Sequence, residues 1–189
     1  MTSTDDNETV GSPLAFYGVA LGLFLATGWM AFMSAKPVLV SGVLYINLFA
    51  LTLYDLRYFR LPNILTATLF IVGAIFIWVH PPYAVSDHLI GAVIGLLLFP
   101  ALNWFYRRYR GRDGIGLGDA KLLAGLGLWL GWQALPPLLL IASVSGLVFA
   151  LVKHLMERQK ANDVTLSQRL PFGAFLCLAG WLIWLFFPL

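Results

Sequence analysis

Long apolar segments separated by short polar stretches occupy almost the whole chain beyond residue 13. A membrane-spanning α-helix needs about 20 apolar residues, because the hydrocarbon core of a bilayer is about 30 Å thick. The pattern therefore predicts an all-α fold, a polytopic bundle of about seven transmembrane helices (six to eight). The expected spans cover residues 14–34, 37–55, 63–80, 88–106, 119–135, 136–153 and 171–188. The fifth is the shortest and the richest in glycine, so a full crossing is least expected there.

The composition excludes several classes of protein. The 189 residues are 60% hydrophobic and 11% charged, far from the balance of a soluble domain or of a disordered chain. A single cysteine, Cys177, excludes a disulfide scaffold, and the three histidines lack metal-ligand spacing, so we expect no metal and no other cofactor. Twelve basic and nine acidic residues leave little excess charge for binding nucleic acid. We expect residues 1–13 to be a polar tail and 14–189 to be one membrane-embedded domain.

The basic residues predict the orientation of the bundle. Eleven of the twelve fall in or beside alternate loops: Arg57, Arg60, Arg107, Arg108, Arg110, Arg112, Lys121, Lys153, Arg158, Lys160 and Arg169. Only Lys36 lies in a connection of the other set. Because cytoplasmic loops collect Lys and Arg, this end of the bundle is expected in the cytoplasm. Seven spans then put the N-terminus inside and the C-terminus outside.

Small and aromatic residues add expectations about packing. Glycines four residues apart allow neighbouring helices to approach closely. Such pairs are Gly18 with Gly22, Gly91 with Gly95, and Gly127 with Gly131. The seven Trp and seven Tyr are expected near the two interfaces, as aromatic belts.

Two carboxylates stand out because they adjoin or lie within apolar segments. Asp55 closes the second span and Asp119 opens the fifth, whereas the other acidic residues lie in the tail or in loops. Both therefore belong at the cytoplasmic end, on separate helices, and an acid at membrane depth is a functional candidate. Two neighbouring carboxylates do not both ionise readily, so one keeps its proton while the other stays charged. Such a pair can activate water and protonate a scissile carbonyl, which is aspartyl protease chemistry.

Other interpretations of these residues remain open at this point. Asp119 could be the N-cap of its helix, and Asp55 could pair with Arg57. Lys121 either modulates the protonation of the pair or extends to the interface from a helix end. A proton-coupled transporter could use the same aspartates as a relay, although no internal repeat or interrupted helix supports this alternative.

Three motifs together resemble the bacterial type IV prepilin leader peptidases, membrane aspartyl proteases of the Gly-x-Gly-Asp class. The first is Tyr54-Asp55-Leu-Arg-Tyr-Phe-Arg-Leu-Pro62-Asn63. The second is Gly116-Leu-Gly118-Asp119-Ala-Lys121, preceded by Gly114. The third is Arg169-Leu-Pro171-Phe-Gly173. The resemblance covers about residues 40–189, in the order of that family. Presenilin-like proteases share the first two motifs, but their Pro-Ala-Leu follows the second aspartate, whereas Pro100-Ala-Leu precedes it here.

The resemblance implies a function and a site. Asp55 and Asp119 would be the catalytic pair, without a cofactor. The substrates would be type IV prepilins or pseudopilins of type II secretion, cut after the glycine that ends a short basic leader. Cleavage would occur at the cytoplasmic face of the bacterial inner membrane, with the C-terminus in the periplasm. The expected partners are these precursors and membrane lipid, and the sequence leaves the oligomeric state open.

The chain also departs from the larger members of that family. Those carry a cytoplasmic domain with two Cys-x-x-Cys zinc-binding pairs between their first two spans, and they methylate the new N-terminus. Here only a few residues around Lys36 link these spans, and Cys177 is the single cysteine, so a tetrathiolate zinc site cannot form within this sequence. We therefore expect a short form with peptidase activity and without methyltransferase activity.

Overall fold

The computed structural model describes residues 18, 22, 24–29, 37–80, 84–110, 116–158 and 171–186. Its elements from residue 38 onward are α3 (Val38–Tyr58), α4 (Asn63–Val79), α5 (Val85–Arg110), α6 (Leu117–Leu130), the short 3-10 helix η1 (Trp132–Ala134), α7 (Leu135–Arg158) and α8 (Phe172–Phe186). The prediction of an all-α bundle is confirmed, since every regular element in these ranges is helical. The predicted polar tail, residues 1–13, lies outside the described residues.

The helices coincide with the apolar segments of the sequence, although their lengths differ. Three stretches are long and apolar enough to cross a membrane: Val38–Tyr58, Val85–Tyr109 and Trp132–Val152. Asn63–Val79 and Phe172–Phe186 are shorter apolar helices. The first predicted span, 14–34, falls mostly outside the described residues. These are the helices of a multi-pass membrane protein.

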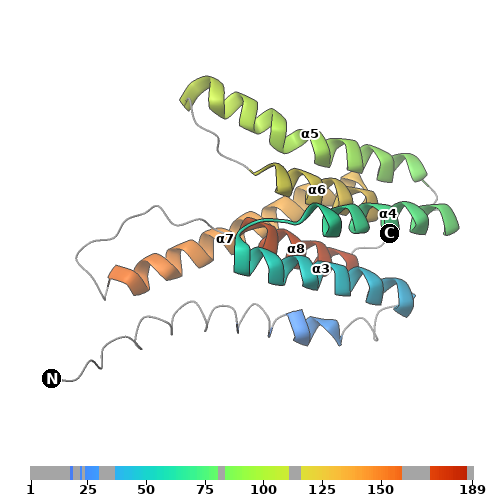
Figure 1. The fold of residues 1–189 in the computed structure, drawn as a ribbon, viewed down its shortest axis with the longest axis horizontal. Coiled ribbons are helices and arrows are strands. Elements are labelled where there is room, and N and C mark those ends of the chain that lie inside the picture. The colour runs from blue at the N-terminus through green and yellow to red at the C-terminus, as the bar shows by residue number, and fades with distance from the viewer. Residues whose placement is uncertain are drawn as a thin grey trace.

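Helix α6 is the centre of the bundle and is shorter than the predicted fifth span. It ends at Leu130, because Gly131 adopts a left-handed φ of +80° and η1 follows. Fourteen residues rise only about 21 Å at 1.5 Å per residue. From Leu122 to Leu130 every residue is buried, against α5, α4 and α8, and this central position is visible in Figure 1.

Glycines allow the backbones of α5 and α6 to touch. A Cβ atom on Gly91 would collide with the carbonyl of Gly127, and one on Gly127 would collide with Gly91. Gly95 lies equally close to the backbone of α6. The packing role is thus confirmed for these residues, but a Cβ on Gly18 or Gly22 would meet no described atom within 4 Å.

Three of the seven tryptophans, Trp129, Trp181 and Trp184, lie in the core, which corrects the expectation of aromatic belts for these three, whereas Trp29, Trp78, Trp104 and Trp132 are exposed. Trp129 and Trp184 are each 1% exposed and form a three-ring cluster with Phe76, in which Trp129 stacks on Phe76 and Trp184 meets both rings edge to face. Trp181 is also buried, and its Nε1 has no hydrogen-bond partner among the described residues. Trp129 Nε1 donates to the Leu69 carbonyl at 2.9 Å, and Trp184 Nε1 donates to Ser41 Oγ at 3.0 Å. Such a partner makes indole burial favourable.

The helices alternate in direction, so one end of the bundle collects the chain segments that matter for function. The C-terminal ends of α3, α5 and α7 lie there with the N-terminal ends of α4, α6 and α8, at the left in Figure 1. All described Lys and Arg residues lie at or near this end: Arg57, Arg60, Arg107, Arg108, Arg110, Lys121, Lys153 and Arg158. Both candidate aspartates belong to the same end.

The contact between α5 and α6 predicts a stability difference between two glycine substitutions. Gly127→Ala should lower the free energy of unfolding by about 1–3 kcal/mol, because a methyl group there meets rigid backbone. Gly42→Ala on α3 is the matched control, since its Cβ would meet no described atom within 4 Å. Thermal unfolding in detergent measures both. Equal melting temperatures for the two variants would contradict the close approach of α5 and α6.

Candidate active site

Asp55 lies in the last turn of α3 and is fixed by the first turn of α8. Its side chain is buried, with the residue only 4% exposed. The backbone N–H of Ala174 donates a hydrogen bond of 2.8 Å to Asp55 Oδ2. The first N–H groups of a helix lack acceptors within the helix and carry its positive dipole end, so they favour a carboxylate. The alternative in which Asp55 pairs with Arg57 is not what the described contacts show, since the Arg57 guanidinium lies 5.7 Å from the centre of the Tyr58 ring.

The Pro-Phe-Gly segment explains how α8 can receive this carboxylate. Pro171 directly precedes the helix, a position where proline is well tolerated. Gly173 leaves the space that the carboxylate occupies, since a Cβ atom there would lie 2.9 Å from Asp55 Oδ2. Arg169, the first residue of this motif, lies outside the described residues.

Asp119 lies in the first turn of α6 and is half-buried. Gly116, not Asp119, is the N-cap residue, so the interpretation of Asp119 as an N-cap is wrong. The Asp119 N–H donates to the Gly116 carbonyl at 3.2 Å, and its carboxylate turns back toward the same glycine. Gly114 lies outside the described residues.

The fold brings the two aspartates to the same end of the bundle. Asp55 lies in the last turn of α3 and Asp119 lies in the first turn of α6. Leu61, from the turn between α3 and α4, contacts Gly118 beside Asp119 and Gly173 beside Asp55. The first turns of α6 and α8 therefore lie on either side of one leucine side chain.

Lys121 joins two of the sequence motifs. Its Nζ donates a hydrogen bond of 2.7 Å to Oδ1 of Asn63, at the start of α4. Asn63 directly follows Pro62, the N-cap residue of α4. The observed partner of Lys121 is thus an amide of the first motif, so this lysine links the helix of Asp119 to the turn that follows Asp55.

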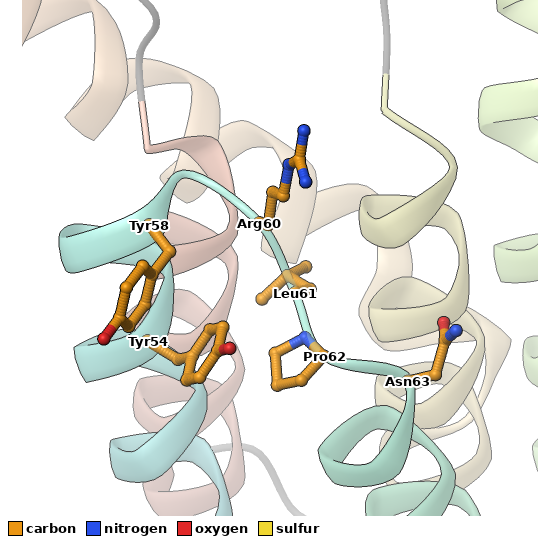
Figure 2. A pocket seen from close by; sticks show the side chains of 6 residues that line it. All are labelled: Tyr54, Tyr58, Arg60, Leu61, Pro62 and Asn63. Carbon is orange, nitrogen blue, oxygen red and sulfur yellow. The ribbon is translucent and has the colours of Figure 1, made fainter.

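An open pocket of about 410 Å³ lies against this turn. Figure 2 shows its lining residues: Tyr54, Tyr58, Arg60, Leu61, Pro62 and Asn63. The two tyrosine rings lie 4.6 Å apart, and both side chains are substantially exposed. The turn begins at Phe59, which has a left-handed φ of 51° and whose N–H caps α3 on the Asp55 carbonyl.

Sequence reasoning missed two contributors to this geometry. Ala174 acts through its backbone N–H, which no side-chain pattern marks. Leu61 lies within the first motif, but only the contacts with α6 and α8 distinguish it from the other leucines. Within the described ranges, no three His, Cys, Asp or Glu side chains gather as a group that could hold a metal ion.

Comparison with known proteins identifies the family. The profile of the type IV leader peptidase family matches residues 42–151. This range includes both aspartates, and the chain belongs to that family.

Individual relatives agree with this assignment. The chain is 37% identical over 172 residues to a prepilin leader peptidase/N-methyltransferase of Aeromonas salmonicida, covering 90% of this chain and 55% of the relative. It is 36% identical over 159 residues to the protein of that name in Pectobacterium carotovorum subsp. carotovorum, covering 83% and 54%. The chain therefore spans about half the length of the curated relatives it matches. No solved structure matches it.

The contact between Asp55 and Gly173 predicts a coupling that unfolding experiments can measure. Gly173→Ala should destabilise the protein by about 1–3 kcal/mol, since the new methyl group crowds a carboxylate held by α8. In an Asp55→Ala background the same change should cost less, because the crowded atoms are gone. A double-mutant cycle of unfolding free energies in detergent isolates this coupling. Additive effects would contradict the contact.

Proposed function

We propose that this chain is an aspartic endopeptidase that cleaves the short basic leader of type IV prepilins or of type II secretion pseudopilins after glycine. The observation that carries the proposal is the convergence of Asp55 and Asp119 at one end of the bundle, inside the region matched by the leader peptidase family. Family membership also disfavours the proton-coupled transporter as an alternative.

The surroundings of the two aspartates support different roles for them. The Ala174 N–H and the positive end of the α8 dipole partly offset the cost that burial imposes on a charged Asp55. A charged Asp55 disfavours a second charge on neighbouring Asp119, so the pair holds one proton, on Asp119. Asp55 then takes a proton from the attacking water while Asp119 donates its proton to the carbonyl oxygen of the scissile peptide. The tetrahedral intermediate collapses as Asp55 passes its proton to the leaving amine nitrogen and Asp119 recovers a proton from a hydroxyl of the intermediate, which yields two peptides without a covalent enzyme intermediate.

The remaining motif residues are supporting residues in this proposal. Gly116 and Gly118 shape the first turn of α6, and the hydrogen bond between Lys121 and Asn63 keeps that turn beside the end of α3. Pro171 and Gly173 prepare the start of α8 for the Asp55 carboxylate.

The location of cleavage follows from the charge distribution. The described Lys and Arg residues lie at or near the end of the bundle that carries both aspartates. The positive-inside rule assigns this end to the cytoplasm. We therefore propose a bacterial inner-membrane enzyme that meets its precursors at the cytoplasmic face, with its N-terminus inside and its C-terminus in the periplasm.

Neutral isosteres of the aspartates test the proposed mechanism. Asp55→Asn or Asp119→Asn should lower cleavage of a prepilin with a basic leader by about 10²- to 10⁴-fold or more, since each removes a proton-transfer group. Membrane insertion should be unchanged. Asp87→Asn, in the first turn of α5 at the opposite end of the bundle, is the matched control and should cleave normally. Near-normal cleavage by either site variant would remove that residue from the mechanism.

A second prediction concerns methylation. These 189 residues contain one cysteine, so they cannot supply a tetrathiolate zinc site of their own. Incubation with prepilin and S-adenosylmethionine should yield cleaved pilin without added methyl mass, as measured by intact-mass spectrometry. Cleavage should also persist in EDTA. A methylated product would overturn the assignment as a peptidase alone.

A further inference from the structure

One side chain belongs both to the open pocket and to the surroundings of the two aspartates. Leu61 lines the pocket together with Tyr54 and Tyr58, and it also contacts the first turns of α6 and α8. Figure 2 shows Leu61 in the turn between α3 and α4, with the two tyrosine rings on the α3 side. The pocket and the proposed catalytic pair are therefore neighbouring spaces with Leu61 as their shared wall.

The distances from Leu61 to the starts of α6 and α8 show how closely its side chain is packed there. A Cβ atom on Gly118 would lie 3.3 Å from Leu61 Cβ, and one on Gly173 would lie 3.1 Å from Leu61 Cδ1. The same point at Gly173 is 2.9 Å from the Asp55 carboxylate. An added carbon atom at Gly173 would be too close to the carboxylate, and one at Gly118 would require Leu61 to shift slightly.

We propose that Leu61 is a specificity-determining residue that restricts the position before the scissile bond to a residue without a side chain. This inference rests on the proposed function. A peptide carbonyl must come within hydrogen-bonding distance of both aspartates, and the residue that carries it enters the space beside Leu61. Glycine fits there, whereas a Cβ atom would meet the Leu61 side chain.

The backbone around Leu61 keeps this wall in place. Phe59 holds a left-handed conformation at the end of α3, and the ring of Pro62 fixes its own φ at the start of α4. Leu61 is also packed against the main hydrophobic core. Because the turn is fixed at both ends, the side chain cannot easily withdraw, and shortening it would connect the aspartates to the pocket of about 410 Å³.

A change of substrate preference tests the proposal. The substrates are two purified prepilins that differ only in having glycine or alanine before the scissile bond. The variants are Leu61→Ala and the milder Leu61→Val, in the full chain in detergent or membranes. Leu65→Ala is the matched control, since Leu65 is also partly buried against the core but lies outside the pocket lining. The readout is the ratio of kcat/KM for the two substrates, which a general loss of folded enzyme does not alter.

The expected results are specific to Leu61. The wild type should prefer the glycine substrate by about 10- to 200-fold, the usual size of discrimination against one extra carbon. Leu61→Ala should reduce this preference at least about tenfold, by raising cleavage of the alanine substrate, and Leu61→Val should reduce it partly. Leu65→Ala should keep the wild-type ratio.

The outcomes that contradict the two proposals are distinguishable. If Leu61→Val and Leu61→Ala cleave the glycine substrate with an unchanged ratio, the role of Leu61 is overturned while the peptidase function stands. If Leu61→Ala does not fold, the ratio for Leu61→Val decides alone. If the folded wild type cleaves neither substrate, the proposed function itself is overturned.

Discussion

The hydrogen bond from the Ala174 N–H to Asp55 Oδ2 joins the end of α3 to the start of α8, and the arrangement of the site depends on it. A carboxylate in an apolar bundle needs a compensating partner, because an unpaired buried charge is costly. Here the partner is the first turn of a helix, which offers free N–H groups and a favourable dipole without adding a charged side chain. This solution requires a residue without a side chain at Gly173, since the carboxylate occupies the place of its Cβ.

The burial of α6 is the second feature on which the arrangement of the site depends. Beyond Lys121 the helix is enclosed by its neighbours, and glycines on α5 and α6 bring the two backbones into contact. The accessible part of α6 is therefore its first turn, which carries Gly116, Gly118 and Asp119. A helix enclosed by protein need not match the thickness of the bilayer, because its surroundings are other helices and not lipid. The short length of α6 is thus compatible with its position against α4, α5 and α8.

Much of this architecture was predictable from the sequence. The apolar segments predicted the helices, because helix formation in a membrane depends on local composition. The charges of the loops predicted that Asp55 and Asp119 lie at one end, because successive helices alternate in direction. The three motifs could be recognised, but their contacts could not. The hydrogen bond between Lys121 and Asn63 depends on packing between segments far apart in sequence. The early end of α6 depends on the left-handed conformation at Gly131, whose neighbours in the sequence are apolar.

The unequal exposure of the two aspartates bears on how a peptide reaches them. Asp55 is 4% exposed and is held from the α8 side, whereas Asp119 is half-buried in the accessible turn of α6. Among the described residues, Asp55 is therefore the more shielded of the two, and Leu61 contacts the helix starts beside both of them. The proposed mechanism uses this difference, with Asp55, held by α8, as the base and Asp119, in the accessible turn of α6, as the acid.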